Sequence, residues 1–155
     1  MAGADDLRAL MRDVPAAVAV LTVDAGGQRA GLTVTALVSL SLEPPLIGIA
    51  VGRQAALHEL VREAGEFAVS ILAAGQEGLA QHFARGVPPI GLWRRIDTHE
   101  GMLGAPLLDG ALGWLECRLT AEQAAGDHTL FVGEVVSVER GPGRDALTYL
   151  RQSYT

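Results

Sequence analysis

A run of alternating residues from Leu32 to Leu42 carries the hydroxyl groups on which the functional interpretation depends. Every second residue of the run is apolar, and the positions between them carry mostly hydroxyls: Thr33, Thr35, Ser39 and Ser41. A period of two predicts one long β-strand with two different faces. Short hydroxyls leave the backbone approachable and both donate and accept, so this face suits a flat polar ligand. The alternative is a half-exposed strand that uses Thr and Ser as ordinary strand residues.

A histidine beside an aspartate lies at a predicted hairpin turn. Asp127 follows Gly126, and His128 opens the next strand. The ring of His128 is therefore expected near the rim of a barrel. There it could hold a phosphate or an amide group, or transfer a proton. The alternative is a solvated turn histidine.

Two further groups of residues could contact a cofactor. Gly52 and Arg53 stand between the end of a strand and the start of a helix, where arginine, backbone N–H groups and the helix start suit a phosphate. The alternative for Arg53 is a solvated loop arginine. Tyr149 and Tyr154 lie in the tail, where stacking on a ligand and capping of the barrel both remain open.

Other chemistry is not expected. Cys117 is in phase with Leu115 and Leu119, so a buried structural thiol is favoured over a nucleophile. The four histidines are scattered without a ligand pair at helical spacing, which argues against a metal site. The segment 141–146 matches G-x-G-x-x-A, but only the residues up to Thr155 follow it, too few for a dinucleotide-binding unit.

Length and composition predict one domain spanning residues 1–155. The hydrophobic share is 49% and the charged share 19%, which argues against disorder. A net charge of −6, with arginine as the only basic residue type besides histidine, argues against a nucleic-acid partner. An acidic start without a signal peptide and the lack of a long apolar run predict a cytoplasmic protein without a membrane partner.

Hydrophobic periodicity and turn residues predict the elements that position these residues. Besides the run at 32–42, strands are expected at Ala16–Val23, Leu46–Val51, Phe67–Leu72, Ala111–Gln123 and His128–Glu139. Short helices are expected at Asp5–Val14, Ala55–Ala64 and Gln76–Ala84, an irregular segment at 85–106, and a terminal helix or extended tail at Asp145–Tyr154. Strands joined mostly as hairpins predict a mainly β protein, a closed antiparallel barrel whose halves are split in sequence.

Two motifs in this order carry a family resemblance. Gly31 to Pro45 follows G-x-T-x-(S/T)-(S/A)-x-x-S-x-S-x-x-P-P, and residues 126–135 read Gly-Asp-His-Thr-Leu-Phe-Val-Gly-Glu-Val. Together with shorter matches through most of the chain, they resemble the short-chain flavin reductase family, which has an FMN-binding split barrel. This family includes the reductase components of two-component flavin-dependent monooxygenases.

The resemblance implies a homodimer that binds FMN or FAD near the subunit interface. Hydride would pass from NADH or NADPH to the flavin, and a partner monooxygenase would receive the reduced flavin. The isoalloxazine ring would lie along Thr33–Ala36, with the phosphate at Gly52–Arg53 and His128 on the nicotinamide side as the catalytic residue. The complete set of expected cofactor-binding residues is Thr33, Val34, Thr35, Ala36, Ser39, Ser41, Gly52, Arg53, Phe83, Arg85, Asp127, Tyr149 and Tyr154.

One segment departs from the family pattern. Members usually carry hydroxyl residues after the arginine of the phosphate loop, but this chain has Ala55, Ala56 and Leu57 there. The flavin would then be a loosely held substrate, or arginines such as Arg85 would replace the missing donors. The alternative function is a flavin-binding or carrier protein without reductase turnover; a third is the same barrel with deazaflavin or haem.

Overall fold

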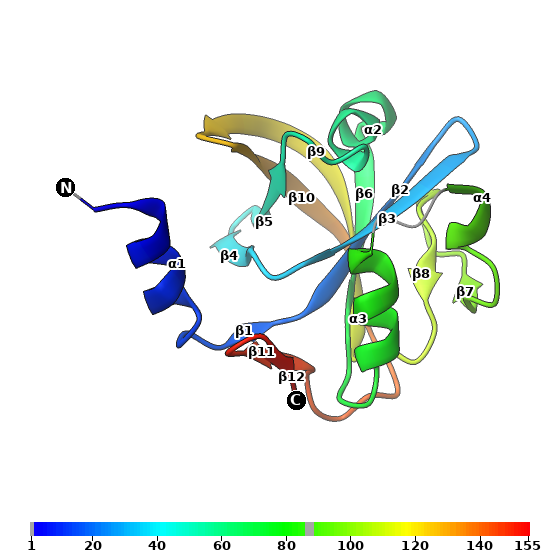
Figure 1. Ribbon diagram of the computed structural model, residues 1–155. Coiled ribbons are helices and arrows are strands. Elements are labelled where there is room, and N and C mark those ends of the chain that lie inside the picture. Colours follow the sequence, from blue (N-terminus) through cyan, green and yellow to red (C-terminus); the bar gives the residue numbers. More distant parts are fainter. Residues whose placement is uncertain (1, 86–88) are drawn as a thin grey trace.

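The computed structural model describes residues 2–85 and 89–155. Figure 1 shows strands from distant parts of the chain gathered into one curled layer with short helices around it. The helices are α1 (Ala4–Met11), α2 (Leu57–Ala64), α3 (Glu77–Ala84) and α4 (Pro89–Leu92). The strands are β1 (Ala16–Ala17), β2 (Ala19–Ala25), β3 (Gln28–Val34), β4 (Leu37–Leu42), β5 (Pro45–Gly52), β6 (Glu66–Ile71), β7 (Thr98–His99), β8 (Leu107–Leu108), β9 (Gly113–Ala125), β10 (His128–Arg140), β11 (Thr148–Leu150) and β12 (Ser153–Tyr154).

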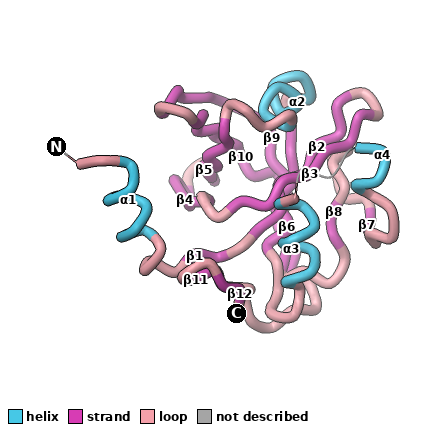
Figure 2. The backbone as a smooth tube through the Cα atoms, in the orientation of Figure 1, coloured by secondary structure: helices cyan, strands magenta, loops and turns pink. Residues whose placement is uncertain are grey.

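Seven of these strands form one antiparallel sheet in the order β3-β2-β6-β9-β10-β5-β4. The two edge strands, β3 and β4, are neighbours in the chain and are joined only by Thr35 and Ala36. The sheet must therefore curl until its edges meet at this link, as Figure 2 shows. At the junction, the backbone N–H of Ala50 in β5 donates to the carbonyl of Ala36 at 3.1 Å. A mainly β, antiparallel, barrel-like architecture is thus confirmed.

The prediction of one continuous strand from Leu32 to Leu42 is wrong. The chain leaves β2 at Val34 and joins β5 at Leu37, so the alternation belongs to two strands at opposite sheet edges. A register shift between Ser39 and Ser41 disturbs the alternation again within β4. The physical reason is closure of the sheet: one chain segment must turn the corner between its two edges.

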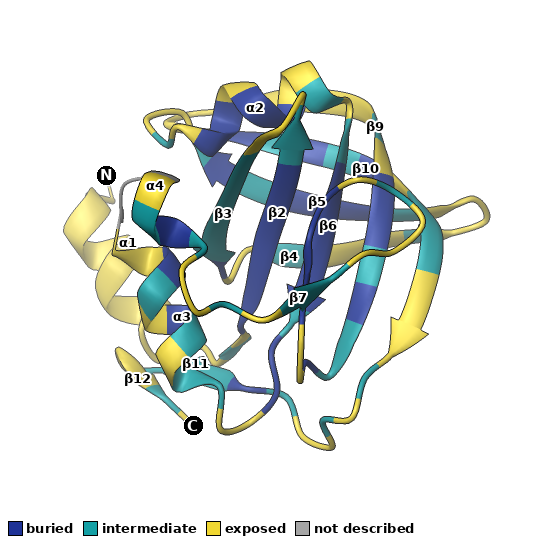
Figure 3. Ribbon diagram, turned by 90° about the vertical axis from the view of Figure 1, so that its right-hand side faces the viewer, coloured by how far each residue is buried: buried dark blue, intermediate teal, exposed yellow. Residues whose placement is uncertain are grey.

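Apolar residues are buried on both faces of β2. Leu21 and Val23 belong to a core cluster inside the curled sheet, which includes Phe67 and Phe131 and is covered by α2. Val20 points to a second cluster that packs beneath α3. Figure 3 shows β2 and β6 as the buried centre of the molecule. Because both faces are covered, β2 reads as a nearly continuous apolar run.

The helices and the tail refine the sequence predictions. Helix α2 begins at Leu57, two residues later than expected, and ends where Gly65 adopts φ 67°, the left-handed conformation that favours glycine. The tail from residue 145 is extended and ends in the β11–β12 hairpin, which pairs with β1. Part of the predicted irregular segment 85–106 contains α4 and β7; its residues 86–88 lie outside the described residues.

Helix α1 stands clear of the sheet at the N-terminal end (Figure 1), and every residue of it is exposed. Within residues 2–85 and 89–155, no helix has both the length and the apolar character required to cross a membrane.

Candidate functional site

The outer face of β5 forms a low surface, here called the shelf, made by Gly48, Ala50 and Gly52. These residues alternate with core residues, so the small side chains all point away from the core. A Cβ atom added to Gly48 would lie 3.1 Å from the side chains of Val38, Leu40 and Leu130. These side chains bury Gly48, so the partly exposed residues Ala50 and Gly52 are the part of the shelf on which a planar ring could lie.

The link between β3 and β4 lies beside the middle of the shelf, because Ala36 accepts from the N–H of Ala50. Thr35 and Ala36 are exposed there and line a groove of about 400 Å³. The tail closes one side of this groove with Tyr149 and Gln152. Residues from α1 and the segment after it complete the wall: Arg8, Met11, Arg12, Val14 and Ala16. The groove thus joins both ends of the chain to the predicted ring-binding segment.

His128 lies on the opposite side of β5 from the link, on β10. It pairs with Gly52 across the β5–β10 ladder, and a Cβ atom at Gly52 would lie 3.9 Å from both Cε1 and Nε2 of its ring. Ala50, which bonds to Ala36, is two residues from Gly52, a separation of about 7 Å along a strand. The structure therefore brings together the two motifs that the sequence analysis singled out.

Asp127 orients the ring of His128. Their Oδ1 and Nδ1 atoms are 2.7 Å apart, and the His128 side chain is 48% exposed. The hydrogen bond from His128 holds the pKa of Asp127 below its usual value, and the charge of Arg53 acts in the same direction. An ionised Asp127 keeps a proton on Nδ1, so Nε2 is the nitrogen left to meet a ligand.

The predicted phosphate loop meets the same turn. The backbone N–H of Arg53 donates to the carbonyl of Asp127 at 3.0 Å, which fixes Gly52 and Arg53 beside His128. The Arg53 side chain is exposed. No side chain caps the start of α2 at Ala56, and residues 54–57 supply no hydroxyl group. Arg53 lines a pocket of about 290 Å³ together with Arg62 and Thr129. Arg62 is already paired with Glu59 and Glu122, so Arg53 and the backbone groups of the loop are the donors that remain for an anion.

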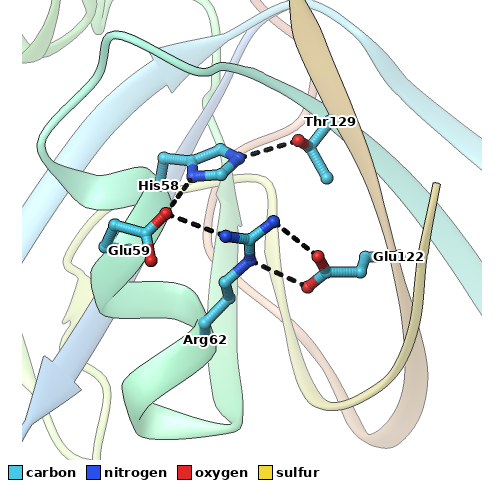
Figure 4. Close-up of polar contacts among 5 residues, drawn as sticks. All are labelled: His58, Glu59, Arg62, Glu122 and Thr129. Carbon is cyan, nitrogen blue, oxygen red and sulfur yellow. Dashed lines mark hydrogen bonds and ion pairs between the residues drawn. The ribbon is translucent and has the colours of Figure 1, made fainter. Parts of the chain in front are cut away.

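A polar cluster ties α2 to the hairpin that carries His128 (Figure 4). His58 is 4% exposed; its Nε2 lies 2.7 Å from Thr129 Oγ1 and its Nδ1 lies 3.0 Å from Glu59 Oε1. Arg62 donates to Glu59 at 2.9 Å and to both carboxylate oxygens of Glu122 at 3.0 and 2.6 Å. Because Thr129 follows His128 in the chain, these contacts fix the strand from which the His128 ring projects.

Three predicted cofactor-binding residues lie away from the groove. Thr33 donates its hydroxyl to the carbonyl of Ala80 at 2.7 Å and so holds α3. Val34 belongs to the core. Phe83 is 2% exposed and packs on Gly31, where an added Cβ would lie 2.7 Å from its ring. Thr33 and Phe83 thus connect β3 to α3, and Val34 faces the core on the opposite side of the strand. Of the predicted segment, only Thr35 and Ala36 face the groove.

The expected single hydroxyl face does not exist. Ser39 pairs with Ile47 and so shares the side of the sheet that faces the core, opposite to Val38 beside the shelf. Ser41 lies beyond the register shift and pairs with Leu46. The break at Thr35–Ala36 and this shift send the hydroxyls in different directions. Arg85 is exposed directly after α3.

Tyr149 and Tyr154 lie side by side in the β11–β12 hairpin. The rings of Tyr149 and Tyr154 are 5.0 Å apart, and burial raises the pKa of the Tyr154 hydroxyl, with a smaller effect of Tyr149. Tyr149 also pairs with Ala16 of β1, which brings it to the groove. The sequence analysis missed Arg8, Arg12 and Gln152. The i, i+4 spacing of the two arginines was the available signal for the first two.

The prediction of a buried structural thiol agrees with the structure. Cys117 is completely buried, and desolvation raises the pKa of its thiol to about 12. It is therefore a structural thiol and not a nucleophile, as predicted. No group of three or more potential metal ligands is found among residues 2–85 and 89–155.

Comparisons with known proteins all identify flavin reductases as similar to this chain. The sequence profile of a family described as flavin reductase like domain matches residues 11–155. The chain is 41% identical over 147 residues to an NADH-dependent FAD reductase of Streptomyces globisporus, covering 92% of this chain and 80% of that protein. It is 42% identical over 137 residues to the reductase component of 4-hydroxyphenylacetate 3-monooxygenase of Thermus thermophilus, covering 88% and 85%. The solved structure of the NADH:FAD oxidoreductase SgcE6 of Streptomyces globisporus C-1027 with NAD and FAD fragments superposes with a TM-score of 0.91 at 38% identity, covering 97% of this chain and 90% of that one.

Proposed function

Because this chain belongs to the flavin reductase like domain family, we propose that it catalyses the reduction of FMN or FAD by a reduced nicotinamide dinucleotide. Relatives are named NADH-dependent FAD reductase and FMN reductase (NADH), which favours NADH as the donor. The observation that carries the proposal is the continuous surface from the Thr35–Ala36 groove across the shelf to His128.

The residues of this surface fit a flavin ring. A planar ring requires a flat bed with few protruding side chains, and the partly exposed Ala50 and Gly52 provide it on β5. Thr35 provides a hydroxyl that can donate to or accept from the polar edge of the ring. Gly52 and Arg53 would take the phosphate, as the family resemblance implies, with Asp127 holding that loop through its carbonyl.

The reaction transfers a hydride from the nicotinamide to the flavin, which also takes up a proton, so that NAD⁺ and reduced flavin leave. The task of the protein is to align two flat molecules. His128 would contact the nicotinamide through Nε2, and Asp127 would keep its ring in that orientation. Tyr149 would cover the groove from the tail side, and Tyr154 would support it.

We further propose that a second copy of the chain covers the exposed apolar residues of α1 and β4. Leu7 and Leu10 on α1 are 62% and 66% exposed, and Val38 and Leu42 on the edge strand β4 are 46% and 86% exposed. Exposed apolar side chains of this kind, when several occur together, are typical of an interface. Reduced flavin released from such a homodimer would serve a separate monooxygenase, and we place both in the cytoplasm.

An anaerobic assay tests the proposed function. The purified protein is mixed with NADH or NADPH and with FMN or FAD, in all four combinations, and the visible absorbance of the flavin is followed. We expect the absorbance to bleach with at least one combination. Saturable flavin binding without bleaching would instead identify a flavin carrier, and the absorbance spectrum of the protein as purified would reveal deazaflavin or haem.

Replacing Thr35 with valine is expected to raise the dissociation constant for flavin by about threefold to tenfold. The two side chains have the same shape, so the change removes one hydrogen bond between neutral groups, of roughly 0.5–1.5 kcal/mol. Thr120→Val is the control, because Thr120 is also an exposed threonine but lies on β9, where its hydroxyl bonds only to the carbonyl of Val132. Fluorescence titration measures both, and equal affinity of Thr35→Val and the wild type would place the ring elsewhere.

A further inference from the structure

Two arginines, Arg8 in α1 and Arg12 at its C-cap, face the groove beside the predicted ring-binding link. Arg8 and Arg12 line it together with Thr35 and Ala36. They are one helical turn apart, so they occupy the same side of α1. The other α1 and adjoining residues of the wall are apolar: Met11, Val14 and Ala16. Two guanidinium groups therefore stand over a groove that is otherwise mainly apolar, in a chain whose net charge is −6.

The charges of these arginines are available for a ligand. Arg12 makes no ion pair with another side chain among residues 2–85 and 89–155. Arg8 bonds to Asp5 at 2.8 Å, but the two side chains are 61% and 96% exposed, and exposed pairs of this kind are weak and easily exchanged. An anion in the groove could therefore engage both arginines without breaking a buried contact.

The tail adds a third polar group through an unusual turn. Arg151 and Gln152 have φ angles of 50° and 63°, the left-handed conformation that is costly for residues with a side chain. Arg151 holds the turn against the end of α1, because its N–H donates to the carbonyl of Arg12 at 2.9 Å and its Nε donates to Asp13 at 2.8 Å. The turn is thus fixed in the place where Gln152 lines the groove beside the two arginines.

We propose that Arg8, Arg12 and Gln152 form an anion subsite for a phosphate group of a dinucleotide whose flat ring lies over Thr35 and Ala36. The inference rests on the proposed function. Guanidinium groups bind phosphate oxygens in pairs, and an amide side chain can donate to a remaining oxygen. Beside the loop after β5, Arg62 and Thr129 line the same pocket as Arg53, but they are already bonded to carboxylates and to His58. Arg53 is then the one arginine that is left for the two phosphates of a diphosphate bridge. Either the nicotinamide dinucleotide or FAD carries such a bridge.

The test removes one charge and varies the phosphate content of both substrates. Arg12→Gln and Arg8→Gln are compared with the wild type for the donors NADH and 1-benzyl-1,4-dihydronicotinamide, which has no phosphate. The acceptors are FAD, FMN and riboflavin, the last without phosphate. For the substrate whose phosphate binds at the subsite, NADH or FAD, we expect the KM to rise about tenfold in Arg12→Gln and by a smaller factor in Arg8→Gln. With 1-benzyl-1,4-dihydronicotinamide and riboflavin, neither of which carries a phosphate, we expect no change. Arg118→Gln, at an exposed position on β9, is the control for the lost charge.

Varying the hydride donor and the flavin acceptor separately identifies which substrate carries the bound phosphate. A rise confined to NADH assigns the subsite to the nicotinamide dinucleotide, and a rise confined to FAD assigns it to the flavin. An equal loss with the phosphate-free pair, or no loss with any substrate, would overturn the anion subsite. Titration of the variants with NADH, FAD and riboflavin gives the same comparison without turnover. A wild-type protein that fails to reduce any flavin would therefore refute the proposed function, while the titration would still decide the subsite.

Discussion

Alanine in place of His128 is expected to slow flavin reduction by NADH about 10-fold to 100-fold while changing flavin affinity much less. The ring of His128 lies beside Gly52 at the end of the shelf, with Nδ1 held by Asp127 and Nε2 free to meet the nicotinamide. The change removes the side chain that aligns the nicotinamide, and a displacement of about 1 Å between reacting groups can slow a reaction about 100-fold. The flavin would keep its contacts at Thr35 and on β5.

Rapid mixing under anaerobic conditions measures the reduction rate, and fluorescence titration measures flavin affinity. His99→Ala is a matched control, because His99 also bonds through Nδ1 to an aspartate, Asp109, at 2.6 Å but lies on β7 away from the shelf. It should leave both quantities near their wild-type values. If His128→Ala reduced the rate and the flavin affinity by the same factor, His128 would lie outside the nicotinamide site.

The hairpin that carries His128 could be predicted from local sequence alone. Two long alternating segments flank Gly126, and the structure has β9 and β10 there, ending and starting within two residues of the predicted positions. Gly126 adopts φ 62°, the conformation for which a turn glycine is selected. Both signals act over a few residues, so no tertiary information was required.

The break at Thr35–Ala36 could not be predicted in this way. Alternation continues on both sides of the link, and nothing in the local sequence says that β3 and β4 belong to opposite edges of the sheet. That arrangement follows from pairing with β2 and β5, which are distant in space until the sheet closes. The hydroxyls were therefore assigned to one face, although only Thr35 reaches the groove.

The residues that line the groove could not be predicted from local sequence either. Its residues come from α1, the link and the tail, which meet because β11 pairs with β1 and Arg151 binds the end of α1. Arg12 and Gln152 were missed because each is an ordinary polar residue in its own segment. Motif residues such as His128 and Arg53 were found because short patterns marked them. For residues outside such motifs, only long-range contacts show which of them lie in the site.

A glycine of the second motif provides the other large expected effect. Replacing Gly133 with alanine should lower the free energy of unfolding by about 1–3 kcal/mol, the usual cost of forcing extra volume into a packed core. An added Cβ would lie 2.5 Å from Cζ of Phe67 and 2.8 Å from Cβ of Cys117. Phe67 and Cys117 are completely buried, so neither can move aside without disturbing the core cluster.

Urea unfolding followed by circular dichroism measures this loss. Gly78→Ala introduces the same methyl group in the exposed part of α3, where no atom lies within 4 Å of the new Cβ, and should leave stability unchanged or slightly raised. Equal stability of the two variants would mean that β10 can shift away from Phe67. A loss confined to Gly133→Ala, with flavin affinity retained, would show that the glycine of the Gly-Glu-Val segment serves packing, whereas the histidine five residues before it serves the ligand.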